Sequence, residues 1–323
     1  MKIRKYQLIN SEMKKLIYIL TATAFAFVSC NKTSKTEAQM VTLDYNVAVP
    51  AALTKVATIG DASHVNELVC AVYEDGVELT RQTIEYIVGG SFSYKPSLYI
   101  GREYQIVFWA HKKDYYDLSD LTDITWKDGF KTNDENADAF TFTETVKINS
   151  DKSVTVVSSQ ESGSTTRDAI LKRPFVGLNL KLKVSDIPEV LSHSRITFSK
   201  LQTHYDAVAG EEVSDKMLSE TSSSAEILPD LVTIDGIDYR IISLNYLIPG
   251  STPDITIEVA SKDFNSPDFN PESDILLNFD LPDNLPLNPN VQINITANLK
   301  AELEYTITIN DDFADGDQNH NIK

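Results

Sequence analysis

The chain has 323 residues, 42% of them hydrophobic, with 29 basic and 47 acidic side chains and a formal net charge of −18. This composition is typical of a chain that folds around a hydrophobic core, and it excludes collagen-like or largely disordered classes. The acidic balance excludes nucleic acid as a partner and disfavours attraction to anionic lipid, because both need a basic surface.

The first predicted element is a signal peptide over residues 1–29, with Met13 as the expected true start. Two lysines follow Met13, and residues 16–28 form an apolar run. As a helix this run would span ~20 Å, too short for the ~30 Å hydrocarbon core of a membrane. It ends in Phe27-Val28-Ser29-Cys30, which resembles a bacterial lipobox. We expect Cys30 to be lipidated and to anchor the protein at the outer membrane; a plain secretory signal with an incidental cysteine is the alternative.

After a polar tether over residues 30–40, apolar residues alternate with a period of two, which predicts an all-β chain. We expect an N-terminal β-sandwich over residues 41–160 and a C-terminal β-sandwich over residues 173–323. Between them, a stretch rich in Ser, Thr and Gly predicts a linker at residues 161–172. The clearest strands are expected at 41–49, 67–73, 103–110, 140–143, 153–157, 175–184, 239–247, 255–260, 275–279, 291–297 and 302–309. A short helix over residues 114–121 is an alternative to a strand there.

No pattern typical of a catalytic site is present. The five histidines form no local pair, and neither a nucleophile elbow nor a phosphate-binding glycine loop occurs. Cys70 alternates within an apolar strand and is expected in the core. The acidic stretches 263–270 and 310–317 lack the ligand spacing of a calcium loop and are interpreted as solvated loops. The sequence therefore predicts no enzyme activity, no cofactor and no metal site.

One cluster of aromatic residues could bind sugar. Trp109, Tyr115, Tyr116 and Trp126 lie within a short stretch, and exposed rings of this kind stack on pyranose faces. These four residues define a possible glycan platform. The alternative is that the same rings pack in a core, as aromatic side chains in strands usually do.

Three short motifs carry a resemblance to a known family. They are Thr-Lys-x-Ala-x-Ile-Gly-Asp at 54–61, Tyr-x-x-x-Phe-Trp-Ala at 104–110, and the run from Thr166 to Phe175. With the lipobox leader, they resemble the fimbrillin superfamily, the type V pilins and fimbrillin-like surface lipoproteins of Bacteroidales. The resemblance implies two transthyretin-like β-sandwich domains on a lipidated precursor, and assembly rather than catalysis.

In that family, a protease specific for Arg or Lys removes the first strand, and a strand of a neighbouring subunit fills the vacated groove. The resemblance implies Lys55 as the cleavage site; cleavage at Lys32 or Lys35 would keep the first strand. The candidate donor lies within residues 291–310 and presents an apolar face made by Leu303, Tyr305, Ile307 and Ile309. Alternatively, these residues are the last strands of their own domain.

The sequence thus predicts a structural subunit of a cell-surface fimbria, or pilus, or a fimbrillin-like adhesin component. Its expected partners are other fimbrial subunits, the membrane through lipid on Cys30, and a host or bacterial surface receptor. Two alternatives stay open: a glycan-binding outer-membrane lipoprotein, and an anchor or accessory protein that does not polymerise.

Overall fold

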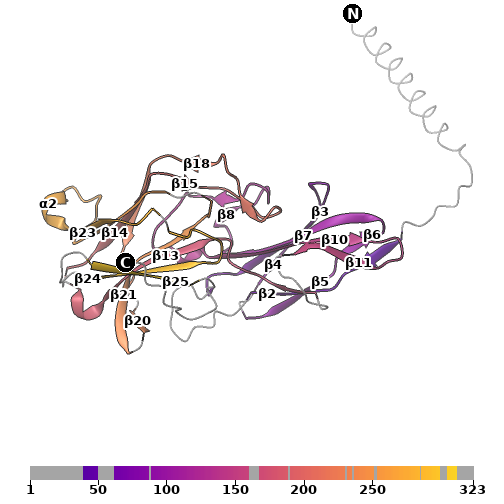
Figure 1. Cartoon of the computed structure of the whole chain (residues 1–323), viewed down its shortest axis with the longest axis horizontal. Coiled ribbons are helices and arrows are strands. Elements are labelled where there is room, and N and C mark those ends of the chain that lie inside the picture. Colours follow the sequence, from indigo (N-terminus) through magenta and orange to yellow (C-terminus); the bar gives the residue numbers. More distant parts are fainter. Residues whose placement is uncertain are drawn as a thin grey trace, which may run out of the picture. The chain divides into compact units, whose positions relative to one another are not determined.

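The computed structural model describes residues 39–49, 62–86, 89–159, 167–187, 190–229, 231–234, 236–250, 253–283, 285–298 and 304–310 (Figure 1). The chain divides into two compact units, Met1–Met40 and Val41–Lys323. Only residues 39 and 40 of the first unit are described, so the account below concerns the second. The expected signal peptide and the lipidation site at Cys30 lie outside the described residues.

The N-terminal half of the second unit contains two packed sheets. A five-stranded sheet has the order β11-β10-β7-β3-β4, and a three-stranded sheet has the order β12-β2-β5. A further short pair joins β1 to β6. The strands are β1 (Met40–Thr42), β2 (Tyr45–Ala48), β3 (Glu67–Glu74), β4 (Val77–Glu85), β5 (Ser91–Tyr94), β6 (Ser97–Tyr99), β7 (Arg102–His111), β10 (Ala139–Ile148), β11 (Val154–Ser159) and β12 (Asp168–Ile170). Apolar side chains from both sheets, among them Val47, Cys70 and Phe108, form the first core between them.

The strand β3 reads as a continuous apolar run because both of its faces are buried. Its even-numbered side chains, from Leu68 to Val72, belong to the first core. Its odd-numbered side chains, from Val69 to Tyr73, belong to a different apolar cluster on the opposite face of the sheet. A strand buried on both sides needs apolar residues at every position, which hides the period of two.

The C-terminal half repeats this arrangement with its own core. A five-stranded sheet has the order β20-β21-β13-β24-β25, and a four-stranded sheet has the order β19-β14-β22-β23 (Figure 1). The strands are β13 (Val176–Lys183), β14 (His193–Phe198), β19 (Thr221–Glu226), β20 (Leu231–Ile234), β21 (Ile237–Leu247), β22 (Ile255–Ala260), β23 (Ile275–Asp280), β24 (Gln292–Asn298) and β25 (Glu304–Asn310). Leu180 of β13, Ile257 of β22 and Ile295 of β24 lie in this second core.

A long connection between β7 and β10 joins the two halves. It contains β8 (Tyr116–Asp117), β9 (Thr125–Trp126) and the 3-10 helix η1 (Glu135–Ala137). Ile124 exchanges two backbone hydrogen bonds with Tyr205, each 2.9 Å long. Asn133 accepts from the N–H of Leu244 at 2.8 Å and donates to the hydroxyl of Ser194 at 3.0 Å. A third apolar cluster, with Trp109 of β7 and Tyr246 of β21 among its members, fills this junction.

Short elements complete the described part of the chain. They are β15 (Leu201–Gln202) with β18 (Met217–Leu218), β16 (Tyr205–Asp206) with β17 (Glu211–Glu212), the 3-10 helix η2 (Val184–Asp186) and the helix α2 (Pro271–Asp274). Asn270 caps α2 by accepting from the N–H of Glu272. Among the described residues, no helix is long and apolar enough to cross a membrane.

The prediction of an all-β chain with packed sheets is confirmed. The alternative of a helix over 114–121 is wrong, because this stretch forms β8 and turns. Part of the expected linker also forms a strand: β12 lies within residues 161–172 and pairs with β2. Ala169 of β12 and Leu171 after it are both fully buried in the first core, which explains this pairing. The domain boundaries themselves stay a prediction.

Candidate functional site

The candidate site is the β2 slot, which we define as the position between β5 and β12 that residues 43–49 fill. The strand β2 pairs antiparallel with β5 and parallel with β12. On the β12 side, the N–H of Asn46 donates to the carbonyl of Arg167, and the N–H of Leu171 donates to the carbonyl of Ala48, both at 3.0 Å. The strand β2 is therefore a central strand, hydrogen-bonded along both edges.

One face of this segment is buried. Leu43, Tyr45, Val47 and Val49 are 4%, 1%, 0% and 1% exposed, whereas Asp44 between them is exposed. The alternation predicted from the sequence is confirmed here. Burying an apolar side chain of this size contributes about 1.5–3 kcal/mol. The four positions thus hold the segment firmly in the first core.

A largely buried polar cluster lies against Tyr45, the second of these positions. The hydroxyl of Tyr45 donates to Oε2 of Glu144 at 2.6 Å, and Nη1 of Arg167 donates to the same oxygen at 2.9 Å. The guanidinium of Arg167 also lies over the Tyr45 ring, 5.5 Å from its centroid. Burial and the nearby Glu144 carboxylate raise the pKa of Tyr45, so its hydroxyl keeps its proton and acts as a donor. The Tyr45 hydroxyl and Arg167 therefore both donate to Glu144 in the slot.

The end of the segment is held by a second tyrosine. The N–H of Val49 donates to the hydroxyl of Tyr86, which donates to the carbonyl of Gly90, both at 2.8 Å. Residues 50–61, and Lys55 with them, lie outside the described part of the chain. Cleavage at Lys55 therefore stays a prediction.

The expected donor residues lie in the protein's own C-terminal sheet. Ile307 and Ile309 of β25 are 1% and 6% exposed in the second core. The ring of Tyr305 stacks on Phe279 with centroids 5.3 Å apart. Leu303 lies outside the described residues. In this structure β25 is thus a strand of its own domain, as the alternative interpretation expected, and donation to a neighbour stays a prediction.

The proposed glycan platform is wrong. Trp109, Tyr116 and Trp126 are 0%, 3% and 5% exposed, and Tyr115 is half-buried. Trp109 contacts Tyr116 and Phe175 edge to face, with centroids 5.7 and 6.0 Å apart. Trp109 lies on the face of β7 that the connection between the two halves covers, so these rings pack on one another and offer no face to a sugar.

The buried cysteine behaves as the sequence predicted. Cys70 lies fully buried in the first core, and burial raises the pKa of its thiol to about 12. At neutral pH such a group stays protonated and is a poor nucleophile. Cys70 is therefore a core residue, and nothing around it is typical of a catalytic thiol.

The acidic loop after β22 uses its carboxylates to hold its own turns. Asp263 accepts from the N–H of Asn265 at 2.9 Å. Lys262 pairs with Asp268 at 3.6 Å and with Asp274 at 3.3 Å. Within the described residues, no cluster of His, Cys, Asp and Glu could hold a metal ion. The acidic stretch 310–317 lies outside them except for its first residue.

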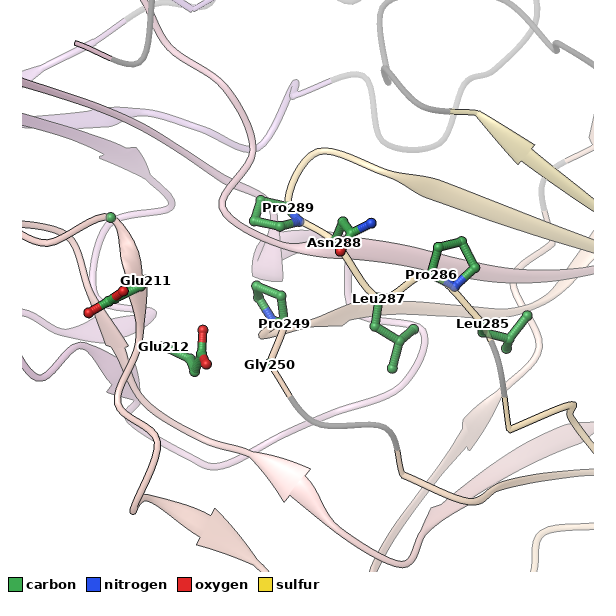
Figure 2. A pocket seen from close by; sticks show the side chains of 10 residues that line it. Glu211, Glu212, Pro249, Gly250, Leu285, Pro286, Leu287, Asn288 and Pro289 are labelled. Atoms are coloured by element: carbon green, nitrogen blue, oxygen red, sulfur yellow. The ribbon is translucent and has the colours of Figure 1, made fainter. Parts of the chain in front are cut away.

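A surface cavity of about 410 Å³ lies in the C-terminal half. Its walls come from β17, from the residues that follow β21 and from the loop before β24. The lining residues are Gly210, Glu211, Glu212, Pro249, Gly250, Leu285, Pro286, Leu287, Asn288 and Pro289 (Figure 2). Gly250 has φ +104°, and a Cβ there would overlap the side chain of Glu212. The glycine is thus required for the close approach of these two residues.

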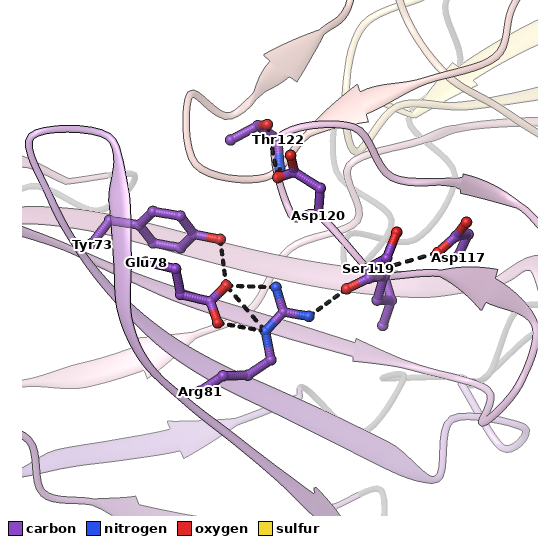
Figure 3. Close-up of polar contacts among 8 residues, drawn as sticks. Tyr73, Glu78, Arg81, Asp117, Ser119, Asp120 and Thr122 are labelled. Carbon is purple, nitrogen blue, oxygen red and sulfur yellow. Dashed lines mark hydrogen bonds and ion pairs between the residues drawn. The ribbon is translucent and has the colours of Figure 1, made fainter. Parts of the chain in front are cut away.

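A second polar cluster fixes the edge strand β4. The hydroxyl of Tyr73 donates to Oε2 of Glu78 at 2.9 Å, and Nε of Arg81 donates to the two Glu78 oxygens at 3.0 and 3.1 Å (Figure 3). Arg81 also donates to the carbonyl of Leu118 in the connection between the two halves. The polar side chains of Tyr73, Glu78 and Arg81 therefore hold β4 against its neighbours and against the connection between the two halves.

Reasoning from the sequence missed the polar partners of the slot. Glu144 and Arg167 are 23 residues apart, and Tyr45 is 99 residues from Glu144. No local spacing connects such residues. The only available signal was Arg167 itself, which belongs to the motif from Thr166 to Phe175, although nothing in that motif indicates its partner.

A family model matches residues 32–323, nearly the whole chain, and its description is "Family of unknown function (DUF6562)". The chain belongs to this family. No curated protein matches the chain. The family description assigns no activity, so it adds no functional residue to those described above.

Three solved structures are similar to this chain over most of its length. The fimbrial anchor protein Mfa2 from Porphyromonas gingivalis is 14% identical with a TM-score of 0.45, covering 83% of this chain and 96% of that one. A fimbrial assembly protein from Parabacteroides distasonis is 11% identical with a TM-score of 0.43, covering 83% and 96%. A fimbrilin from Porphyromonas gingivalis is 9% identical with a TM-score of 0.37, covering 80% and 89%. The functional proposal below rests on the β2 slot.

Proposed function

We propose that this protein is a structural component of a cell-surface fimbria, anchored through lipid on Cys30 and assembled by strand exchange after cleavage at Lys55. The observation that carries the proposal is the position of the first strand. This strand, β2, fills the middle of a sheet between β5 and β12, and only the short strand β1, which pairs with β6, precedes it in the described part of the chain. Lys55 follows this strand in the sequence and precedes β3.

Cleavage after Lys55 would leave the first strand bound by non-covalent contacts alone. Its loss would expose the unpaired backbone edges of β5 and β12, together with the apolar floor that Val47 and Val49 cover. Unpaired backbone groups and exposed apolar surface are both unfavourable in water. A strand with the same alternation, supplied by a neighbouring subunit, would satisfy both.

The proposed donor is the C-terminal segment with Leu303, Tyr305, Ile307 and Ile309. Within the described residues β25 pairs with β24 alone, so it is an edge strand. Detaching an edge strand breaks one ladder of hydrogen bonds, whereas detaching a central strand breaks two. β25 is thus one of the two edge strands of its sheet, with β20 at the other edge, and can detach by breaking a single ladder.

Two experiments test this proposal. Protein taken from assembled fibres should begin at Val56, and Lys55→Ala should abolish assembly while the double variant Lys32→Ala, Lys35→Ala assembles normally. Fibres that begin at residue 30 would contradict cleavage at Lys55. Cys30→Ala should leave the leader uncut or release the protein from the membrane fraction; unchanged partitioning into detergent would contradict lipidation.

A second candidate function is a fimbrial anchor or accessory protein that does not polymerise. It is favoured by the burial of Ile307 and Ile309 in their own core, because a strand that stays there cannot be donated. Deleting residues 302–323 separates the two. A subunit should stay folded as a monomer that cannot polymerise, whereas an anchor should lose cooperative unfolding.

A further inference from the structure

Two segments of this chain share one seven-residue pattern. Residues 43–49 read Leu-Asp-Tyr-Asn-Val-Ala-Val, and residues 303–309 read Leu-Glu-Tyr-Thr-Ile-Thr-Ile. Both consist of leucine, an acidic residue and tyrosine, followed by two β-branched aliphatic residues at alternate positions. The first segment fills the β2 slot, and the second contains most of β25.

The β-branched positions that the two segments share are positions whose side chains are buried. Val47 and Val49 are buried in the first core, and Ile307 and Ile309 are buried in the second. Since residues with a spacing of two lie on one face of a strand, the second segment can present the same face to the β2 slot. Its third residue, Tyr305, would then lie where Tyr45 lies.

We infer that a second copy of this chain fills the β2 slot with its residues 303–309, in the register that puts Tyr305 in the place of Tyr45. This inference rests on the assembly route proposed above. We further infer that Glu144 and Arg167 select this register by binding the Tyr305 hydroxyl. Glu144 and Arg167 are thus specificity-determining residues for the incoming strand.

The buried carboxylate gives the physical reason for this selection. Glu144 is 8% exposed and accepts hydrogen bonds from Tyr45 and Arg167. A shift of the incoming strand by one residue would turn its apolar face to solvent. A shift by two would put Leu303 or Ile307 against Glu144, and neither can donate a hydrogen bond to it. Only one register supplies both the apolar face and the hydroxyl.

The number of hydrogen-bonded edges favours transfer from the home sheet. In the described structure β25 pairs only with β24, whereas a strand in the β2 slot pairs with β5 and β12. The transferred strand therefore gains a second ladder and the hydrogen bond to Glu144. The isoleucines at 307 and 309 each add one methylene to sites that now hold valine, so neighbouring side chains must move slightly.

Cysteine pairs measure the register directly. Asn46 lies opposite Ser93 of β5, and Ala48 lies opposite Ser91. In the inferred register Thr306 takes the place of Asn46. The full chain with Thr306→Cys and Ser93→Cys, cleaved until Val56 is its N-terminus and then oxidised, should form a ladder of disulfide-linked chains on a non-reducing gel.

The matched control carries Thr306→Cys with Ser91→Cys, which reports a shift of two residues. All three positions are exposed, and the native thiol of Cys70 is buried. We expect at least tenfold less cross-linking in this control. Equal cross-linking of the two pairs would contradict the inferred register. So would fibres that form without a disulfide between the cysteines introduced at positions 306 and 93. Either result would leave the proposed assembly by strand exchange intact. If the cleaved parent chain forms no polymer at all, the proposed function itself fails.

The role of the hydroxyl is tested by Tyr305→Phe. Losing a hydrogen bond to a charged acceptor should slow assembly about tenfold. In a Glu144→Gln background the same substitution should have a much smaller effect, because the charged acceptor is gone. As a control, the free energy of unfolding of the uncleaved monomer is measured for each variant, so that a loss of stability is not mistaken for slower assembly. Equal effects of Tyr305→Phe in both backgrounds would show that Glu144 does not read the hydroxyl.

Discussion

Replacing Tyr45 by Phe in the uncleaved chain removes a single hydroxyl group from the β2 slot. That hydroxyl donates to Glu144 at 2.6 Å and lies 3.3 Å from Nη1 of Arg167. The ring keeps its edge-to-face contact with Phe108, at 5.5 Å between centroids, so packing is preserved. A hydrogen bond to a charged group contributes ~1.5–3 kcal/mol. Since Glu144 keeps Arg167 as a partner, we expect the free energy of unfolding to fall by ~1.5–2 kcal/mol.

Guanidinium-induced unfolding followed by tryptophan fluorescence measures this change, because Trp109 and Trp126 are both buried in the native state. The control is Tyr99→Phe, at a side chain that is 40% exposed, where the change should stay within ~0.5 kcal/mol. If Tyr45→Phe also changes the free energy of unfolding by no more than ~0.5 kcal/mol, the hydroxyl of Tyr45 does not stabilise the fold through Glu144. Glu144→Gln in combination with Tyr45→Phe should give less than the sum of the two single losses, because the residues share one interaction.

Three other predictions concern buried groups. Asp138→Ala should lower the free energy of unfolding by ~3–5 kcal/mol, because Arg173, 5% exposed and bonded to Asp138 at 2.7 and 2.8 Å, would lose its buried partner. As a control, Asp128→Ala at the exposed ion pair with Lys131 should cost at most ~1 kcal/mol; similar losses for both variants would contradict this. Burial lowers the pKa of His111 from 6.5 to about 4, so the unfolded chain binds this proton more tightly, and stability should fall as the pH decreases from 6.5 to 4. His111→Gln should flatten that part of the pH profile in equilibrium unfolding; an unchanged profile would exclude His111 as its source. The thiol of Cys70, with its pKa raised to about 12, should react with a thiol reagent at pH 8 only in denaturant; rapid labelling of the native chain would show that the first core opens there.

The sequence by itself determined the class of the fold and the face of most strands. The alternation in residues 41–49 and in 291–309 follows directly from the pleat of a strand that is buried on one side, so a period of two can be read without knowing its partners. The same reasoning placed Cys70 in the core. It was less informative for β3 and β7, because strands buried on both faces lose the period, and it assigned the residues of β12 to a linker.

Only the tertiary structure decided what each strand pairs with and which polar groups meet. It put β2 in the centre of a sheet beside β12, more than a hundred residues further along the chain, and it brought Glu144 and Arg167 to Tyr45. It also buried Trp109 and Trp126, which the sequence left free to bind sugar. The physical reason is that period and propensity are properties of neighbouring residues, whereas strand order and buried ion pairs depend on contacts between residues far apart in the sequence, which no local spacing records.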